Sequence, residues 1–124
     1  MRDRTVLSLS FDQENLHRRA DLLKYNGFDV VSVYSPTQAR FEIEMGQCGI
    51  FISCALVPDV VNADLFGLFR RFCPGGVIVH VTSSRPHVPS TTQPHADLEL
   101  DESSCPEGIV EALLKYLDAN KDAA

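Results

Sequence analysis

The sequence predicts a single α/β domain in which helices cover a parallel sheet on both faces. Short apolar runs without polar alternation indicate strands that are buried on both sides. Segments with apolar residues at helical spacing separate these runs, and short connections rich in glycine, proline and serine join them. A chain of 124 residues can close one hydrophobic core and is short for two ordinary domains. We therefore expect one domain over residues 1–124, with an ordered core over about 4–118.

The first predicted strand is Thr5–Phe11, an apolar and partly alternating run. It leads to Asp12, which is a favourable residue for a helix N-cap. The segment Gln13–Asn26 has apolar residues at helical spacing, and Gly27 follows it where a left-handed residue often ends a helix. These residues predict a strand followed by a helix of about four turns.

A second strand and helix follow in the same order. The run Phe28–Tyr34 is rich in β-branched and aromatic residues, which favour strands. Ser35 is a suitable N-cap, and Pro36 then stands at the first helical position. This second helix is predicted to end near Gly46.

The third strand is predicted over Gly49–Ala55 and should be the central one, because its apolar run shows no polar alternation and therefore suggests helices on both faces. The helix that follows Pro58 has a predicted buried face, which consists of Leu65, Leu68, Phe69 and Phe72. The segment Pro74–Gly76 stops this helix, and the strand Val77–Thr82 begins at once.

The last part of the chain departs from the regular pattern. Ser83–His95 holds three prolines and cannot sustain a regular helix, so we expect a loop where a fourth crossover helix would otherwise stand. A short strand over Asp97–Leu100 comes next. Ser104 and Glu107 have the spacing of a capping box before the final helix, and the chain after residue 118 is expected to fray.

Five strands that alternate with helices fit the flavodoxin-like order 2-1-3-4-5 of a doubly wound sheet. In this order, ligands bind beyond the carboxyl ends of the first and third strands. The residues at those strand ends are therefore the candidates for a functional site.

With these elements the chain resembles a bacterial response-regulator receiver domain. The resemblance runs from VLSLSFD through NGFDVVSVYSPTQA, IFISCALVP and VIVHVTSS to ADLELDESSCPEGIVEALLKYL. It implies an acidic pair after the first strand, a phosphorylated aspartate after the third, a hydroxyl residue at the end of the fourth and a lysine after the fifth. Together these groups hold Mg²⁺ and a phosphoryl group.

Most of these groups are replaced in this sequence. The pocket positions that the resemblance assigns, together with the adjacent Asp12, are Ser10, Phe11, Asp12, Cys54, Thr82, Asp101 and Glu102. Ser10 and Phe11 stand where the acidic pair is expected, and Cys54 stands at the phosphoacceptor position. Asp101 and Glu102 follow the fifth strand in place of a lysine, and their charge would repel a phosphate. Only Thr82 keeps the expected residue type.

The resemblance therefore implies a pseudo-receiver, a two-component-type signalling module that acts by protein–protein interaction without aspartyl phosphorylation. No nucleophile, base and orienting group come together in the sequence, so we expect no enzymatic activity, no metal and no cofactor. The alternative is a small-ligand or thiol-redox sensor that uses the crevice around Ser10, Asp12, Cys54 and Thr82. A buried, unreactive Cys54 is favoured over a reactive one, because free cysteine is among the most buried residue types.

The net charge and the composition limit the classes of partner that we expect. The net charge of −6 disfavours nucleic acid, and the two basic pairs, Arg18-Arg19 and Arg70-Arg71, are expected on solvated helix surfaces. The charged N-terminal residues fit neither a signal peptide nor a membrane span, so a cytoplasmic protein with four reduced cysteines is expected. The spacing of His80, His87 and His95 matches no compact metal motif. We expect a protein partner and leave the oligomeric state open, a homodimer included.

Overall fold

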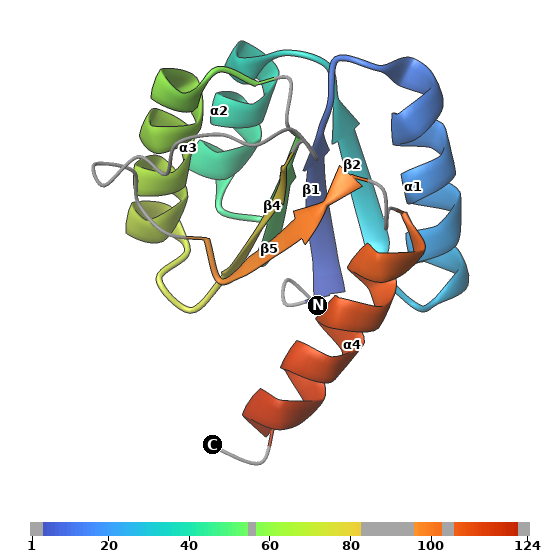
Figure 1. Ribbon diagram of the computed structural model, residues 1–124. Helices are drawn as coiled ribbons and strands as arrows, with labels where there is room; N and C mark the ends of the chain where they lie inside the picture. Colours follow the sequence, from blue (N-terminus) through green and yellow to red (C-terminus); the bar gives the residue numbers. More distant parts are fainter. Residues whose placement is uncertain (1–3, 55–56, 83–95, 103–105, 122–124) are drawn as a thin grey trace.

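The structure is a computed structural model that describes residues 4–54, 57–82, 96–102 and 106–121. These residues contain five parallel strands in one sheet, in the order β2-β1-β3-β4-β5 (Figure 1). The predicted flavodoxin-like α/β fold and its strand order are confirmed. The loop that was predicted over Ser83–His95 and the predicted cap at Ser104 lie outside the described residues.

The strands are β1 Thr5–Leu9, β2 Asp29–Val33, β3 Ile50–Ser53, β4 Val77–Thr82 and β5 Leu98–Asp101. The helices are α1 Gln13–Tyr25, α2 Pro36–Met45, α3 Asp59–Phe72 and α4 Glu107–Lys121. Strand β4 has the predicted bounds. Strand β1 ends two residues earlier than predicted, and β2 is one residue shorter at each end. Strand β3 begins one residue later than predicted and ends at Ser53, and β5 is shifted by one residue toward the C-terminus.

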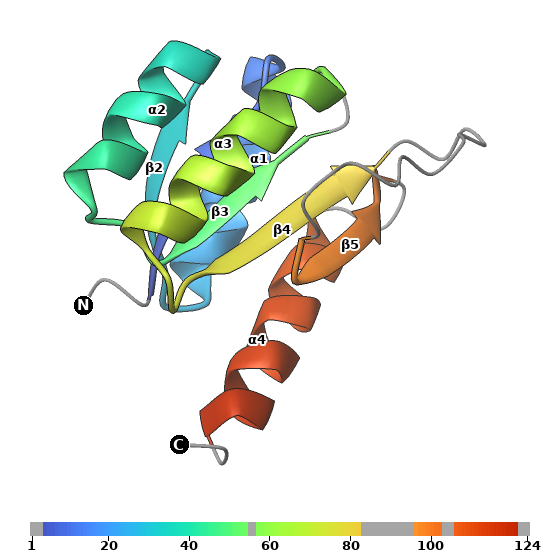
Figure 2. The same cartoon turned by 90° about the vertical axis from the view of Figure 1, so that its left-hand side faces the viewer.

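The sheet carries a hydrophobic core on each face. Helices α2 and α3 cover one face, where Leu7 of β1, Phe51 of β3 and Ile78 of β4 are buried. Helices α1 and α4 cover the other face, where Ile50 and Ile52 of β3 are buried (Figure 2). Strand β3 is therefore enclosed on both sides, as its apolar sequence predicts.

The predicted helix boundaries at α2 are confirmed. The Ser35 side chain accepts a hydrogen bond from the Gln38 backbone N–H at 3.2 Å, and Pro36 occupies the first helical position. Gly46 ends the helix with a φ of 67°, a left-handed conformation that glycine adopts without a steric penalty. Local sequence therefore decides where this helix begins and ends.

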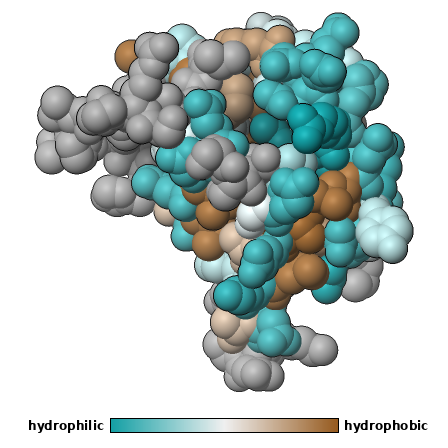
Figure 3. All heavy atoms as spheres, turned by 45° about the vertical axis from the view of Figure 1, so that its right-hand side comes forward, coloured by the Kyte–Doolittle hydropathy of each residue, from teal (hydrophilic) through white to brown (hydrophobic). Residues whose placement is uncertain are grey.

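Helix α4 differs from the prediction at its C-terminal end. It continues to Lys121, past the predicted end of order at residue 118. Its C-terminal half projects beyond the sheet (Figures 1 and 2). Figure 3 shows apolar side chains along α4 and its boundary with α1, bordered by hydrophilic ones, and Leu114 in α4 is 39% exposed. We call this surface the α1–α4 strip, represented by Leu22, Leu114 and Leu117.

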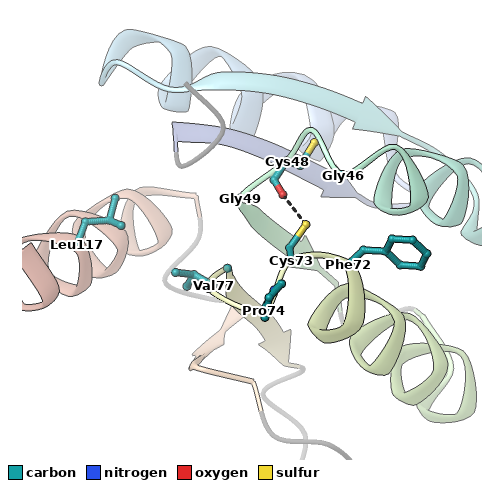
Figure 4. Close-up of a pocket in the computed structure, with 10 residues that line it drawn as sticks. Gly46, Cys48, Gly49, Phe72, Cys73, Pro74, Val77 and Leu117 are labelled. Atoms are coloured by element: carbon teal, nitrogen blue, oxygen red, sulfur yellow. Dashed lines mark hydrogen bonds between the residues drawn. The ribbon is translucent and has the colours of Figure 1, made fainter. Parts of the chain in front are cut away.

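Phe72 lies outside the core, contrary to the prediction for α3. Its side chain is 42% exposed, whereas Phe66 and Phe69 are buried. Phe72 is the last residue of the helix and is among the residues that line a pocket at the edge of the sheet, and Figure 4 shows its ring directed away from Cys73 and Pro74. The helical period alone could not show that α3 passes the edge of the sheet at this residue.

Arg70 was expected on a solvated surface and instead joins α3 to the sheet. Its guanidinium donates to Asp97 Oδ2 at 2.8 Å and to the Gly76 carbonyl oxygen at 3.2 Å. Asp97 Oδ2 also accepts the backbone N–H of Ile78 at 2.8 Å. The half-buried ion pair therefore links α3 to the start of β4 and to the residue before β5.

Close packing makes Gly76 necessary at the start of β4. A Cβ atom at this position would lie 2.6 Å from a ring carbon of Phe69 and 2.9 Å from the carbonyl oxygen of Gly49. Neither neighbour can move freely, because the Phe69 ring is fully buried and the Gly49 carbonyl accepts the N–H of Val77.

We predict that Gly76→Ala lowers the free energy of unfolding by about 1–3 kcal/mol, because the added methyl group overpacks the core. Urea unfolding followed by circular dichroism measures this change. Gly75→Ala is the matched control, since a Cβ at Gly75 has no neighbour within 4 Å. Equal stabilities of the two variants would contradict the packing argument.

Candidate functional site

The candidate site residues lie at one edge of the sheet. All five strands are parallel, so their carboxyl ends meet at the same edge (Figure 1). Ser10, Phe11 and Asp12 follow β1, and Cys54 follows β3. Thr82 ends β4, Asp101 ends β5, and Glu102 comes next. The structure thus places every predicted site residue at this edge.

Asp12 acts as the N-cap of α1. Its carboxylate accepts the Glu14 backbone N–H at 3.0 Å and the Asn15 backbone N–H at 3.4 Å. The other carboxylate oxygen accepts the Asn15 side-chain amide at 3.2 Å. Both oxygens therefore stabilise the start of α1, and the side chain is exposed rather than buried in a pocket.

Ser10 and Phe11 face very different surroundings. Ser10 is buried, and its hydroxyl oxygen accepts the Asp12 backbone N–H at 3.2 Å. Phe11 is 43% exposed. The Ser10 hydroxyl is therefore engaged in a turn, and Phe11 contributes only an aromatic ring. Neither residue offers the carboxylate oxygens that Mg²⁺ prefers.

Cys54 is buried where the chain leaves β3. Its side chain is 7% exposed and belongs to the apolar cluster beneath α2 and α3, together with Leu9, Phe51 and Val57. A thiol among apolar side chains behaves as a small hydrophobic group. The environment of Cys54 fits the buried alternative of the sequence analysis and gives no support to a reactive thiol at this edge.

The carboxyl ends of β4 and β5 carry one hydroxyl and two carboxylates. The Thr82 hydroxyl donates to the backbone carbonyl of Leu100 at 3.2 Å, so it is held by the neighbouring strand. Thr82 is paired with Asp101 in the sheet register. Asp101 is half-buried and Glu102 is exposed. Two carboxylates thus stand at the carboxyl end of β5, where the resemblance implied a lysine.

The position of Arg19 differs from the predicted one. It was expected on a solvated surface, yet its side chain is only 5% exposed. Its guanidinium donates to Ser8 Oγ at 2.9 Å and to the Leu9 carbonyl oxygen at 3.4 Å. Arg19 continues the buried face of α1, three residues after Leu16 and four before Leu23, and this spacing was the signal that could have located it.

A buried polar network lies one residue before Cys54. The Ser53 hydroxyl donates to Asn62 Oδ1, and Asn62 Nδ2 donates to the Val57 carbonyl oxygen at 3.3 Å. Asn62 Nδ2 also lies 3.4 Å from His80 Nε2, which accepts when the imidazole proton is on Nδ1. Asn62 lies between Ser53 and His80 in this network, so the Ser53 hydroxyl is bonded to Asn62 and not to the His80 imidazole. A serine nucleophile would be hydrogen-bonded directly to its histidine base.

Asn62 is on the buried face of α3, in line with Leu65, Phe66 and Phe69. A polar residue on an otherwise apolar helix face is the sequence signal for such a network. His80 is half-buried, as expected for a histidine within a strand. The Phe66 ring packs edge-on against the imidazole, with 5.6 Å between the two ring centroids.

The thiols of Cys48 and Cys73 lie at the opposite edge of the sheet from Cys54. A pocket of about 340 Å³ is lined by Phe72, Cys73, Pro74 and Cys48, among others (Figure 4). The Cys73 thiol donates to the Cys48 carbonyl oxygen at 3.1 Å. Burial, together with the nearby Glu42 and Cys73, raises the pKa of Cys48 to about 11. At neutral pH this thiol is protonated and is a poor nucleophile.

The described residues contain no group of three or more histidine, cysteine or acidic side chains that could hold a metal ion. Among the described helices, none combines the length and apolar character needed to cross a membrane.

The known proteins that this chain matches are solved structures. No family model matches the chain, and no curated protein matches it either. A response regulator receiver protein from Sinorhizobium medicae superimposes with a TM-score of 0.77 at 18% identity, over 93% of this chain and 94% of that one. A chain from the complex of the histidine kinase ThkA with the response regulator TrrA gives a TM-score of 0.74 at 16% identity, over 92% of this chain and 98% of that one.

TrrA from Thermotoga maritima in complex with Mg²⁺ and BeF is similar as well, with a TM-score of 0.75 and 16% identity over 90% of this chain and 97% of that one. The chain therefore has the fold of CheY-like response-regulator receiver domains, as the resemblance in the sequence implied.

We predict that Asn62→Leu lowers the free energy of unfolding by about 1–3 kcal/mol, because the buried Ser53 hydroxyl loses its acceptor. A double-mutant cycle with Ser53→Ala, measured by urea unfolding, tests the link. The double variant should cost less than the sum of the two single variants, since it removes both polar partners. Strictly additive costs would show that the two side chains do not depend on each other.

Proposed function

We propose that the chain is a pseudo-receiver, a signalling module that docks to another protein without being phosphorylated on an aspartate. The observation that carries this proposal is the residue set at the carboxyl ends of β1 and β3. Ser10, Phe11 and Cys54 stand there, and Asp12 is engaged as the cap of α1.

Each of these replacements removes one part of the phosphoryl-transfer chemistry. Mg²⁺ requires several hard oxygen ligands, which a phenylalanine and a hydroxyl in a turn do not supply. Cys54 is buried among apolar side chains and carries no carboxylate that could form an acyl phosphate. Asp101 and Glu102 add negative charge where a dianionic phosphoryl group would have to be neutralised.

Protein docking is the function that remains supported. TrrA has been solved in complex with a histidine kinase, which is a finding about that protein and supports a protein partner for this fold. The apolar α1–α4 strip reaches solvent in Figure 3, and apolar surface bordered by polar residues is typical of protein interaction sites. A fold can keep its scaffold while its function moves to the surface.

Incubation with acetyl phosphate and Mg²⁺, followed by intact-mass measurement, tests the absence of phosphorylation. We expect no phosphoryl adduct, because the acceptor and the metal carboxylates are missing. A receiver domain with an intact aspartate serves as the positive control under the same conditions. An adduct that peptide mapping places on an aspartate of this chain would refute the proposal.

A further inference from the structure

Large apolar side chains reach solvent along the outer side of α2. Phe41 is 61% exposed and Met45 is 54% exposed, and they lie one helical turn apart. Tyr34, just before the helix, is 42% exposed, and its backbone N–H donates to Gln38 Oε1 at 2.8 Å. Gln38 lies one turn before Phe41, so Tyr34 adjoins the same side of the helix. We call Tyr34, Phe41 and Met45 the α2 stripe.

The rest of α2 is already in contact with the fold. Ala39 and Ile43 are buried against the sheet. Arg40 forms an ion pair with Asp64 of α3 at 3.3 Å, so this side of α2 faces its neighbouring helix. Figure 2 shows α2 at the outer margin of its layer, beside β2, which is an edge strand of the sheet. The α2 stripe therefore faces outward.

The grouping of these side chains is what distinguishes the stripe. Among the described residues, the other large apolar side chains that are exposed lie apart from one another: Phe11 after β1, Tyr25 on α1, Val60 and Phe72 near opposite ends of α3, and Leu114 on α4. Leu114 belongs to the α1–α4 strip, where Leu22 and Leu117 are partly buried. Single exposed apolar residues are normal on protein surfaces, whereas contiguous ones mark interaction sites. Phe41 and Met45 share one turn of a ten-residue helix with Tyr34 at its start.

The charges on α2 indicate the character of a partner. Glu42 and Glu44 lie on the same two turns as Phe41 and Met45, and no ion pair joins either glutamate to the part of the chain that the structure describes. The positive charge of Arg40 is matched by Asp64. Since the net charge of the chain is −6, the surroundings of the stripe favour a basic partner.

We propose that the α2 stripe binds an amphipathic helix of a protein partner, with apolar side chains on one face and lysine or arginine along its margins. A helix fits because the stripe follows the axis of α2 for about 15 Å, the length of roughly three helical turns. This inference rests on the proposed docking function and assigns it a surface on the face of the sheet opposite the α1–α4 strip.

The test uses the full chain labelled with ¹⁵N and a synthetic amphipathic helical peptide built from leucine, alanine and lysine. We expect the peptide to shift the backbone signals of residues 34–45 in a saturable manner. The double variant Phe41→Ser/Met45→Ser should weaken binding at least about tenfold, since apolar anchors dominate such interfaces. Glu44→Gln should weaken it less and reduce its dependence on salt.

Tyr25→Ser is the matched control, because Tyr25 is an 88% exposed aromatic residue on α1, away from the stripe. It should leave the affinity unchanged, and circular dichroism should show that all variants remain folded. Absence of peptide binding would overturn the inference, and so would signal shifts that are confined to the α1–α4 strip. Self-association of the chain that the Phe41→Ser/Met45→Ser variant abolishes would also overturn it, because a second copy would then be the occupant. None of these outcomes changes the result expected from the acetyl phosphate experiment. Failure of the α2 stripe inference can therefore be distinguished from failure of the proposed function.

Discussion

The enclosure of β3 is the constraint on which the rest of the structure depends. Every residue of this strand is buried, with β1 and β4 on its two sides and helices over both faces. A parallel sheet of this kind requires crossover helices, and these bring the carboxyl ends of all strands to one edge. Cys54 leaves β3 at that edge and shares the burial of the strand. The same enclosure brings Asn62 over Ser53, where each satisfies the polar group of the other.

The edge that the fold offers to a ligand is occupied by residues that support the scaffold. Asp12 begins α1, the Ser10 hydroxyl holds the turn before it, and the Thr82 hydroxyl joins β4 to β5. Arg19 brings a buried positive charge against the end of β1. Polar groups that are already bonded within the protein are costly to redirect toward a ligand, because their present partners would lose their hydrogen bonds. These interactions favour a fixed edge, which agrees with the docking through outer helix surfaces that we propose.

The sequence predicted the elements of this fold because the signals for them are local. The N-cap and proline at Ser35-Pro36 and the left-handed Gly46 define α2 without reference to the rest of the chain. The misplacement of Arg19 and Phe72 has a different origin, since burial depends on where a helix lies over the sheet. For the candidate site, the sequence was enough to predict which residues stand at the carboxyl ends of the strands. The bonds that occupy Asp12 and Thr82, and the network around Asn62, required coordinates because their partners are set by geometry.

We propose that this receiver fold lacks the chemistry for a metal-bound phosphoryl group. Titration of the ¹⁵N-labelled chain with Mg²⁺, monitored through its amide signals, detects binding of the metal that this chemistry requires. We expect no saturable shift at Ser10, Phe11 and Cys54, which mark the ends of β1 and β3. Saturable shifts centred on these residues would show that a metal site is present at this edge, and would refute the proposed loss of phosphoryl-transfer chemistry.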